Sequence, residues 1–138
     1  MAARIDAYVD TSAFIAFMDI SDSHHALFRR LFAAPPNVVV TSSLVVVEGH
    51  AWFLQRFDRE RALQFLAMIE DMPFLDVRPI GTPDLQGATT MLRRFDDQDL
   101  TLVDSVGLHL MGDGRARECW STDRHLGLTG VPLAIHAA

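Results

Sequence analysis

The chain contains no lysine, and all twelve of its basic residues are arginine. This absence excludes several kinds of chemistry. A nucleotide-binding loop needs a Walker lysine, a pyridoxal enzyme needs a lysine for its Schiff base, and receiver or haloacid-dehalogenase-like sites use a lysine to bind phosphate. Any acidic site in this chain must therefore work without a lysine partner.

Cysteine and long apolar runs are also scarce. Cys119 is the only cysteine, so the chain forms no internal disulfide, and a reducing compartment fits best. Residues 1–6 lack the apolar stretch of a signal peptide, and no window reaches the roughly 18 apolar residues of a membrane span. We therefore expect a soluble, cytoplasmic protein that does not bind a membrane.

Length and composition are those of one globular unit. The 138 residues, 49% of them hydrophobic, suffice for a single domain over residues 1–138. The formal net charge of −6 argues against a broad basic face for nucleic acid, although a local basic groove can exist in an acidic protein. Charge alone leaves the ligand open.

Strand-like and helix-like segments alternate along the chain. Apolar and β-branched runs predict strands at residues 5–9, 37–41, 74–77 and 118–121, with an additional edge strand at 132–136. Apolar periodicity and turn signals predict helices at residues 13–18, 23–32, 43–57, 59–69 and 84–94, and a last one that reaches residue 111. This order is typical of an α/β three-layer sandwich with a mostly parallel sheet of four or five strands.

Four carboxylates lie where such a fold gathers its functional groups. Asp10 and Asp123 each follow a predicted strand, and ligand sites in parallel sheets form at the carboxyl ends of strands. Glu48 and Asp104 lie on apolar helix faces that pack over the same edge. Acids that converge in a partly buried site repel one another unless a cation holds them together.

Each acid also has an ordinary structural explanation. Asp10 is a favoured residue for capping the helix that follows it, and Thr101-x-x-Asp104 is a capping-box pattern. Asp123 fits a loop. Glu48 lies in the middle of a helix and cannot be a cap, so its ordinary explanation is a salt bridge with an arginine.

Hard oxygen ligands, without a matched set of histidines or cysteines, favour Mg²⁺ or Mn²⁺ over Zn²⁺. Carboxylate sites of this kind typically serve phosphoryl chemistry, because a bound cation activates water and stabilises the leaving oxygen. Hydrolysis of a nucleic-acid backbone is therefore the leading reaction class.

Four segments carry a resemblance to a known family: residues 8–17, 41–48, 99–105 and 121–125, in this order and at these separations. Together they resemble a PIN domain and are most similar to the VapC-type toxins of toxin–antitoxin modules. The resemblance implies a metal-dependent endoribonuclease that cleaves RNA, with the four acids binding Mg²⁺ or Mn²⁺. It also implies a cognate antitoxin protein and a homodimer.

The resemblance assigns further roles. Thr11, Ser12 and Thr122 would support the acids by hydrogen bonding, and Asp99 corresponds to an additional outer ligand. Arg124 is the best candidate for a contact with substrate phosphate, because a guanidinium binds phosphate bidentately. For His125, as for the other histidines, a solvated or capping role outweighs a catalytic one.

Two alternatives use the same residues. The chain could be a non-catalytic PIN-fold module that binds RNA or protein, which the acidic net charge favours. It could also be a phosphatase, or a stand-alone nuclease that acts on another nucleic acid, because the site chemistry does not fix the substrate. Retention of all four acids argues against the first alternative.

Overall fold

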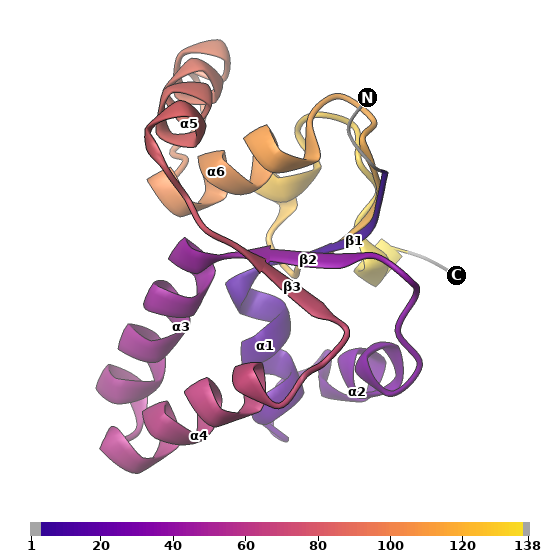
Figure 1. Ribbon diagram of the computed structural model, residues 1–138, viewed down its shortest axis with the longest axis vertical. Helices are drawn as coiled ribbons and strands as arrows, with labels where there is room; N and C mark the ends of the chain where they lie inside the picture. The colour runs from indigo at the N-terminus through magenta and orange to yellow at the C-terminus, as the bar shows by residue number, and fades with distance from the viewer. Residues whose placement is uncertain (1–3, 137–138) are drawn as a thin grey trace.

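Four parallel strands form the sheet around which the chain is arranged (Figure 1). The computed structural model describes residues 4–136, so the first three residues of the N-terminal segment considered above, and the last two of the chain, lie outside it. The strands follow the order β3-β2-β1-β4, and their bounds are β1 Ile5–Val9, β2 Val39–Ser42, β3 Leu75–Arg78 and β4 Ala116–Trp120. Each begins and ends within two residues of its prediction.

The predicted fifth strand at residues 132–136 is wrong. A single parallel bridge joins Leu133 to Cys119, and the chain then turns into a 3-10 helix at Ala134–His136. Proline has no N–H to donate, and Pro132 contributes only its carbonyl, which accepts from Cys119 N at 2.9 Å. The apolar run therefore covers the edge of β4 without extending the sheet.

Helices cover both faces of the sheet, which confirms the three-layer α/β arrangement (Figure 1). One layer consists of α1 Thr11–Met18, α2 His25–Ala33, α3 Ser43–Arg56 and α4 Arg59–Glu70, and the other of α5 Thr82–Arg94 and α6 Leu102–Met111. Ala7 and Val9 of β1 enter the first core, whereas Tyr8 between them enters the second. Among the helices of residues 4–136, none has both the length and the apolar character to cross a membrane.

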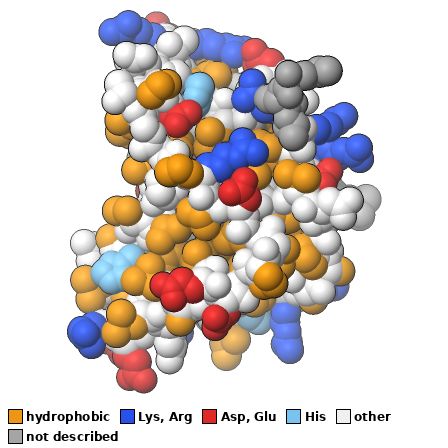
Figure 2. Space-filling view, viewed as in Figure 1, with side chains coloured by type: hydrophobic (Ala, Val, Ile, Leu, Met, Phe, Trp, Pro, Cys, Tyr) orange, Lys and Arg blue, Asp and Glu red, His pale blue; other side chains and the backbone are white. Residues whose placement is uncertain are grey.

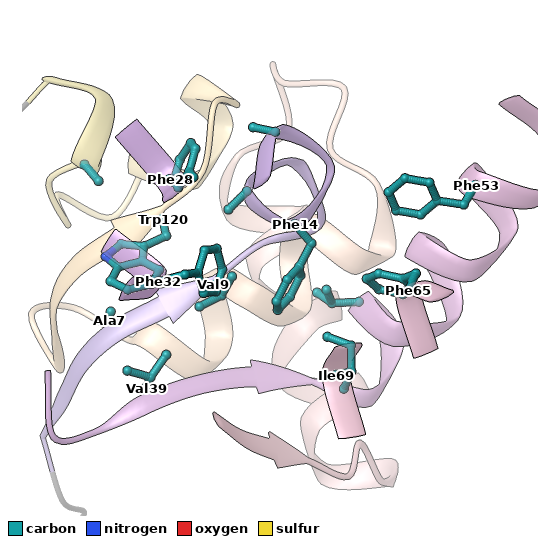
Figure 3. Packing of buried hydrophobic residues seen from close by; sticks show 14 of the residues in the cluster. Ala7, Val9, Phe14, Phe28, Phe32, Val39, Phe53, Phe65, Ile69 and Trp120 are labelled. Carbon is teal, nitrogen blue, oxygen red and sulfur yellow. The ribbon is translucent and has the colours of Figure 1, made fainter. Parts of the chain in front are cut away.

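Aromatic rings fill the larger core (Figure 3). Phe14 of α1 lies against Phe65 of α4 with ring centroids 5.9 Å apart, and Phe65 lies 5.3 Å from Phe53 of α3. Phe32 of α2 joins the cluster to Trp120 of β4, with 5.0 Å between the ring centroids. These contacts fix the positions of α1 and α3, the two elements that follow the carboxyl ends of β1 and β2.

Gly49, which directly follows Glu48 on α3, is required by this packing. A Cβ atom at this position would lie 2.4 Å from the Phe65 ring, closer than such atoms approach in real proteins. The glycine weakens the helix by roughly 1 kcal/mol relative to alanine. It also lets α4 approach α3, and the buried Phe65 ring occupies the space that a side chain at this position would need.

We predict that Gly49→Ala lowers the free energy of unfolding by about 1–3 kcal/mol, the usual cost of overpacking a core, even though alanine favours the helix. Urea denaturation of both proteins measures the difference. Gly127→Ala is the matched control, because its Cβ would only reach ordinary contact distance from Leu133, at 3.7 Å. Equal stabilities of the two variants would show that the Phe65 ring moves freely.

Candidate active site

The four acids converge on one cavity at the carboxyl edge of the sheet. Asp10 follows β1 and Asp123 follows β4, and the backbone N–H of Asp10 donates to the carbonyl of Trp120 at 3.0 Å. Glu48 of α3 and Asp104 of α6 come from opposite helical layers. The cavity has a volume of about 320 Å³ and is lined by Asp10, Thr11, Ser12, Ile15, Glu48, Trp52, Thr101, Asp104 and Asp123.

The surface is indented where these layers meet. In Figure 2 the left outline of the molecule narrows between an upper part, where Figure 1 places α5 and α6, and a lower part, where it places α3 and α4. Because α3 and α6 each contribute an acid to the cavity, the site is bounded by both helical layers.

Asp10 is the most buried of the four acids, with 5% of its surface exposed. It occupies the N-cap position of α1, yet its side chain makes no capping hydrogen bond to that helix. Instead, Asp10 Oδ2 accepts from Ser12 Oγ at 2.9 Å and from Ser121 Oγ at 3.0 Å. Capping therefore does not explain this carboxylate.

Two serines tie the ends of β1 and β4 together. Ser12 Oγ and Ser121 Oγ lie 3.1 Å apart, and Ser12 Oγ accepts from the backbone N–H of Thr122 at 3.0 Å. Ser121 Oγ also accepts from the backbone N–H of Asp123 at 2.9 Å. Ser12 thus donates a hydrogen bond to Asp10, whereas Thr122 contributes through its backbone N–H. Ser121 was not among the predicted supporting residues, although its position directly after β4 could have indicated it.

Asp104 forms the capping box that its sequence pattern predicts. Its Oδ2 accepts from Thr101 N, and its own N–H donates to Thr101 Oγ1, both at 3.1 Å. Asp104 also lines the cavity with the other acids. Capping holds its carboxylate at the first turn of α6, so the structural role and a place in the site are compatible.

Glu48 forms no ion pair with a basic side chain in the part of the chain that the structure describes. Within residues 4–136 no arginine or histidine forms an ion pair with Glu48, Asp10 or Asp104. The salt bridge that offered an ordinary explanation for Glu48 is therefore not present. The buried hydroxyl of Thr11, next to Asp10 in the same cavity, lies near the Glu48 carboxylate and opposes the rise that burial causes in the pKa of Glu48, without a well-aligned hydrogen bond to another described residue.

The acids raise one another's proton affinity. Burial, opposed by hydrogen bonds from Ser12 and Ser121 and assisted by the charge of Asp104, raises the pKa of Asp10 to about 6. Burial also raises the pKa of Glu48, with Asp104 and Asp123 adding to the effect. The pKa of Asp104 is raised by burial first and by the charge of Asp123. Without a cation, the ionised forms of these three acids are therefore destabilised in the folded protein.

This arrangement fits a hard divalent cation. The donors are carboxylate oxygens from four elements, and among residues 4–136 three of these acids form no ion pair with a basic side chain. A cation at this position would offset the burial of these charges first and their mutual repulsion second, the two causes that raise the pKa values.

One histidine lies closer to the acids than the sequence suggested. A ligand atom of each of Asp104, Asp123 and His125 lies within 4.8 Å of the other two. The 3-10 helix Arg124–Gly127 begins directly after Asp123 and turns the His125 ring back towards the carboxylates. The spacing of two residues between Asp123 and His125 was the available signal.

Two other predicted residues lie apart from the cavity. Asp99 is exposed in the loop before α6 and is not among the residues that line the cavity. Arg124 is exposed at the start of the 3-10 helix, one residue from Asp123. A contact of either residue with metal or substrate stays a prediction.

The PIN domain family matches residues 7–122 of this chain. Among curated proteins, the 23S rRNA-specific endonuclease VapC20 of Mycobacterium tuberculosis (strain H37Rv) is 30% identical over 124 residues, which cover 89% of this chain and 93% of that protein. The same description and identity apply to the protein of the CDC 1551 / Oshkosh strain.

Two solved structures have a similar fold. The crystal structure of Mycobacterium tuberculosis VapC20, described as a Sarcin-Ricin loop cleaving toxin, matches with a TM-score of 0.82 and 23% identity over 91% of this chain and 96% of that one. VapBC2 from Rickettsia felis, bound to a DNA fragment from their promoter, matches with a TM-score of 0.63 and 11% identity over 94% and 97%. At these identities the structures support the fold alone.

We predict that metal-free protein loses stability between about pH 4 and pH 6. Asp10 has a pKa of about 6 in the folded chain and 3.8 ordinarily, so over this window the folded state retains a proton that the unfolded state has released. Folding is therefore penalised increasingly as the pH rises. Asp10→Asn removes this penalty and should be more stable than wild type at pH 7, by on the order of 3 kcal/mol.

Urea denaturation in chelator at pH 4, 5, 6 and 7 measures the difference in stability between the two proteins, in which the titration of groups that do not interact with Asp10 cancels. Parallel stability curves for wild type and Asp10→Asn would contradict the predicted burial of a charged Asp10.

Proposed function

The chain belongs to the PIN-domain family, and on this premise we propose that it is a metal-dependent endoribonuclease that hydrolyses phosphodiester bonds of RNA in the cytoplasm. We further propose that it is the toxin of a toxin–antitoxin pair. The observation that carries the proposal is the convergence of Asp10, Glu48, Asp104 and Asp123, three of them without a basic partner in residues 4–136, on one cavity. The relation to an rRNA-specific endonuclease supports RNA as the substrate.

In this proposal the four acids hold Mg²⁺ or Mn²⁺. The bound cation lowers the pKa of an attacking water and stabilises the charge that develops on the phosphate. Ser12 and Ser121 hold Asp10 in place through its Oδ2, which leaves Oδ1 available. The capping box likewise occupies Oδ2 of Asp104 and leaves its second oxygen free.

The cavity has an acidic side and an apolar side. Ile15 and Trp52 provide an apolar side, and Thr101 lies beside the acids. A substrate phosphate at the acids would therefore place the neighbouring ribose or base against an apolar surface, which suits the flat faces of a single-stranded nucleic acid. Arg124 lies next to Asp123 and is available for a second phosphate.

Protein partners have a candidate surface on α3 and α4. Val47, Leu54, Phe57 and Leu63 are exposed there, with Val47 66% exposed, and Figure 2 shows hydrophobic side chains at the surface of the lower part of the molecule. We propose that an antitoxin or a second copy of the chain covers this surface. Light scattering of the purified chain, alone and with a co-expressed antitoxin, distinguishes the two.

We predict that Asp10→Asn and Asp104→Asn each reduce RNA cleavage by about 100-fold or more, because each removes ligand charge at nearly constant volume. The assay follows cleavage of an RNA that contains the sarcin–ricin loop, with Mg²⁺, with Mn²⁺ and with chelator. Asp97→Asn is the matched control, because Asp97 is exposed in the loop before α6 and does not line the cavity, and this variant should cleave at nearly the wild-type rate. Equal cleavage by wild type and both site variants would contradict the proposal.

We also predict that RNA binding changes the fluorescence of one tryptophan. The chain has two, and Trp120 is buried with its indole N–H bonded to Glu118, whereas Trp52 lines the cavity. RNA added to Asp104→Asn, to prevent turnover, should alter the emission of Trp52 in a saturable manner. The signal should vanish in the additional variant Trp52→Phe. A signal that persists there would place the RNA elsewhere.

A further inference from the structure

The His125 ring occupies a position that the four-acid description of the site does not explain. Its Nδ1 atom lies 3.1 Å from Oδ1 of Asp123, and a ring nitrogen and an oxygen of Asp104 fall within the same 4.8 Å cluster. The ring is also partly exposed, with 36% of its side-chain surface accessible. It therefore stands at the border between the cavity and solvent.

When the ring is protonated, this contact is an ion pair between His125 Nδ1 and Asp123 Oδ1 at 3.1 Å. Oδ1 of Asp123 already accepts from the backbone N–H of His125 at 3.0 Å. The ring nitrogen is equally close to that oxygen, yet the two form no aligned hydrogen bond. Neighbouring ligands of an octahedral cation lie about 3 Å apart without bonding to each other. The spacing of the two atoms therefore also suits two ligands of one cation, with an oxygen of Asp104 in the same cluster.

The backbone holds the ring in this position. Asp123 N donates to Ser121 Oγ at 2.9 Å, Leu126 N donates to the Asp123 carbonyl at 3.1 Å, and the Leu126 side chain is fully buried. Asp123 and Leu126, which lie before and after His125 in the sequence, are thus both held in place by the fold. Little ordering is needed for His125 to bind a ligand, which is the requirement for a preorganised metal site.

We propose that His125 supplies a nitrogen ligand beside Asp104 and Asp123 and thereby makes the site selective for Mn²⁺ over Mg²⁺. Mg²⁺ takes oxygen ligands almost exclusively, whereas imidazole nitrogen binds first-row transition metals. Three or four carboxylates alone would not favour Mn²⁺ to the same extent. The inference rests on the proposed metal site, but its test measures metal binding and not cleavage.

The first experiment is calorimetric titration of Mn²⁺ and of Mg²⁺ into wild type, His125→Gln and His50→Gln. His50 is a histidine near Glu48 that does not line the cavity, so it is the matched control. In His125→Gln, Mn²⁺ affinity should fall by about 10- to 100-fold, while Mg²⁺ affinity changes far less. Equal losses for both cations, or no loss for Mn²⁺, would overturn the proposal.

The second experiment needs no variant and so does not depend on how a variant folds. Pulsed electron paramagnetic resonance of Mn²⁺ bound to the wild-type chain should show coupling to a ¹⁴N nucleus, and labelling histidine with ¹⁵N should change that coupling. Bound Mn²⁺ without histidine coupling would overturn the assignment of His125 and leave the four-acid site in place. If the chain bound neither Mn²⁺ nor Mg²⁺, both the assignment of His125 and the proposed four-acid metal site would be overturned.

Discussion

The central constraint on the structure is the burial of four acids in one cavity, three of which have no ion-pair partner among residues 4–136. Burial and neighbouring charge raise the pKa of Asp10, Glu48 and Asp104, so folding without a cation brings together charges that water would otherwise stabilise. A fold that maintains this arrangement must obtain its stability elsewhere. The aromatic core around Phe14 and Phe65 and the parallel sheet supply it, and they hold α1 and α3 against the edge where the acids lie.

Local structure and site use the same atoms. The capping box of α6 positions Asp104, and the serine network that joins the ends of β1 and β4 positions Asp10. Asp10 and Asp104 are therefore each held through one carboxylate oxygen by interactions that the fold requires in any case. A capping or hydrogen-bonding role for a single acid is therefore compatible with a role in the site. Only the convergence of all four acids on one cavity indicates a function.

The sequence predicted those features that depend on local pattern. Strand ends, helix periodicity and the capping box at Thr101 can be read from neighbouring residues, and they were enough to bring Asp10, Glu48, Asp104 and Asp123 to one edge. Features that depend on packing could not be read in this way. The clash that requires Gly49 comes from Phe65 on another helix, and the place of His125 follows from a 3-10 turn. The expected fifth strand stops after one bridge at Leu133, because the chain turns there into a 3-10 helix.

The central claim is that a divalent cation balances the four carboxylates. The most direct test is the anomalous scattering of Mn²⁺ in crystals of the protein grown with that cation. Our account predicts an anomalous peak inside the cavity, within ligand distance of oxygens from Asp10, Glu48, Asp104 and Asp123. A cavity without a peak at saturating Mn²⁺, with the acids turned towards arginines or solvent, would contradict it.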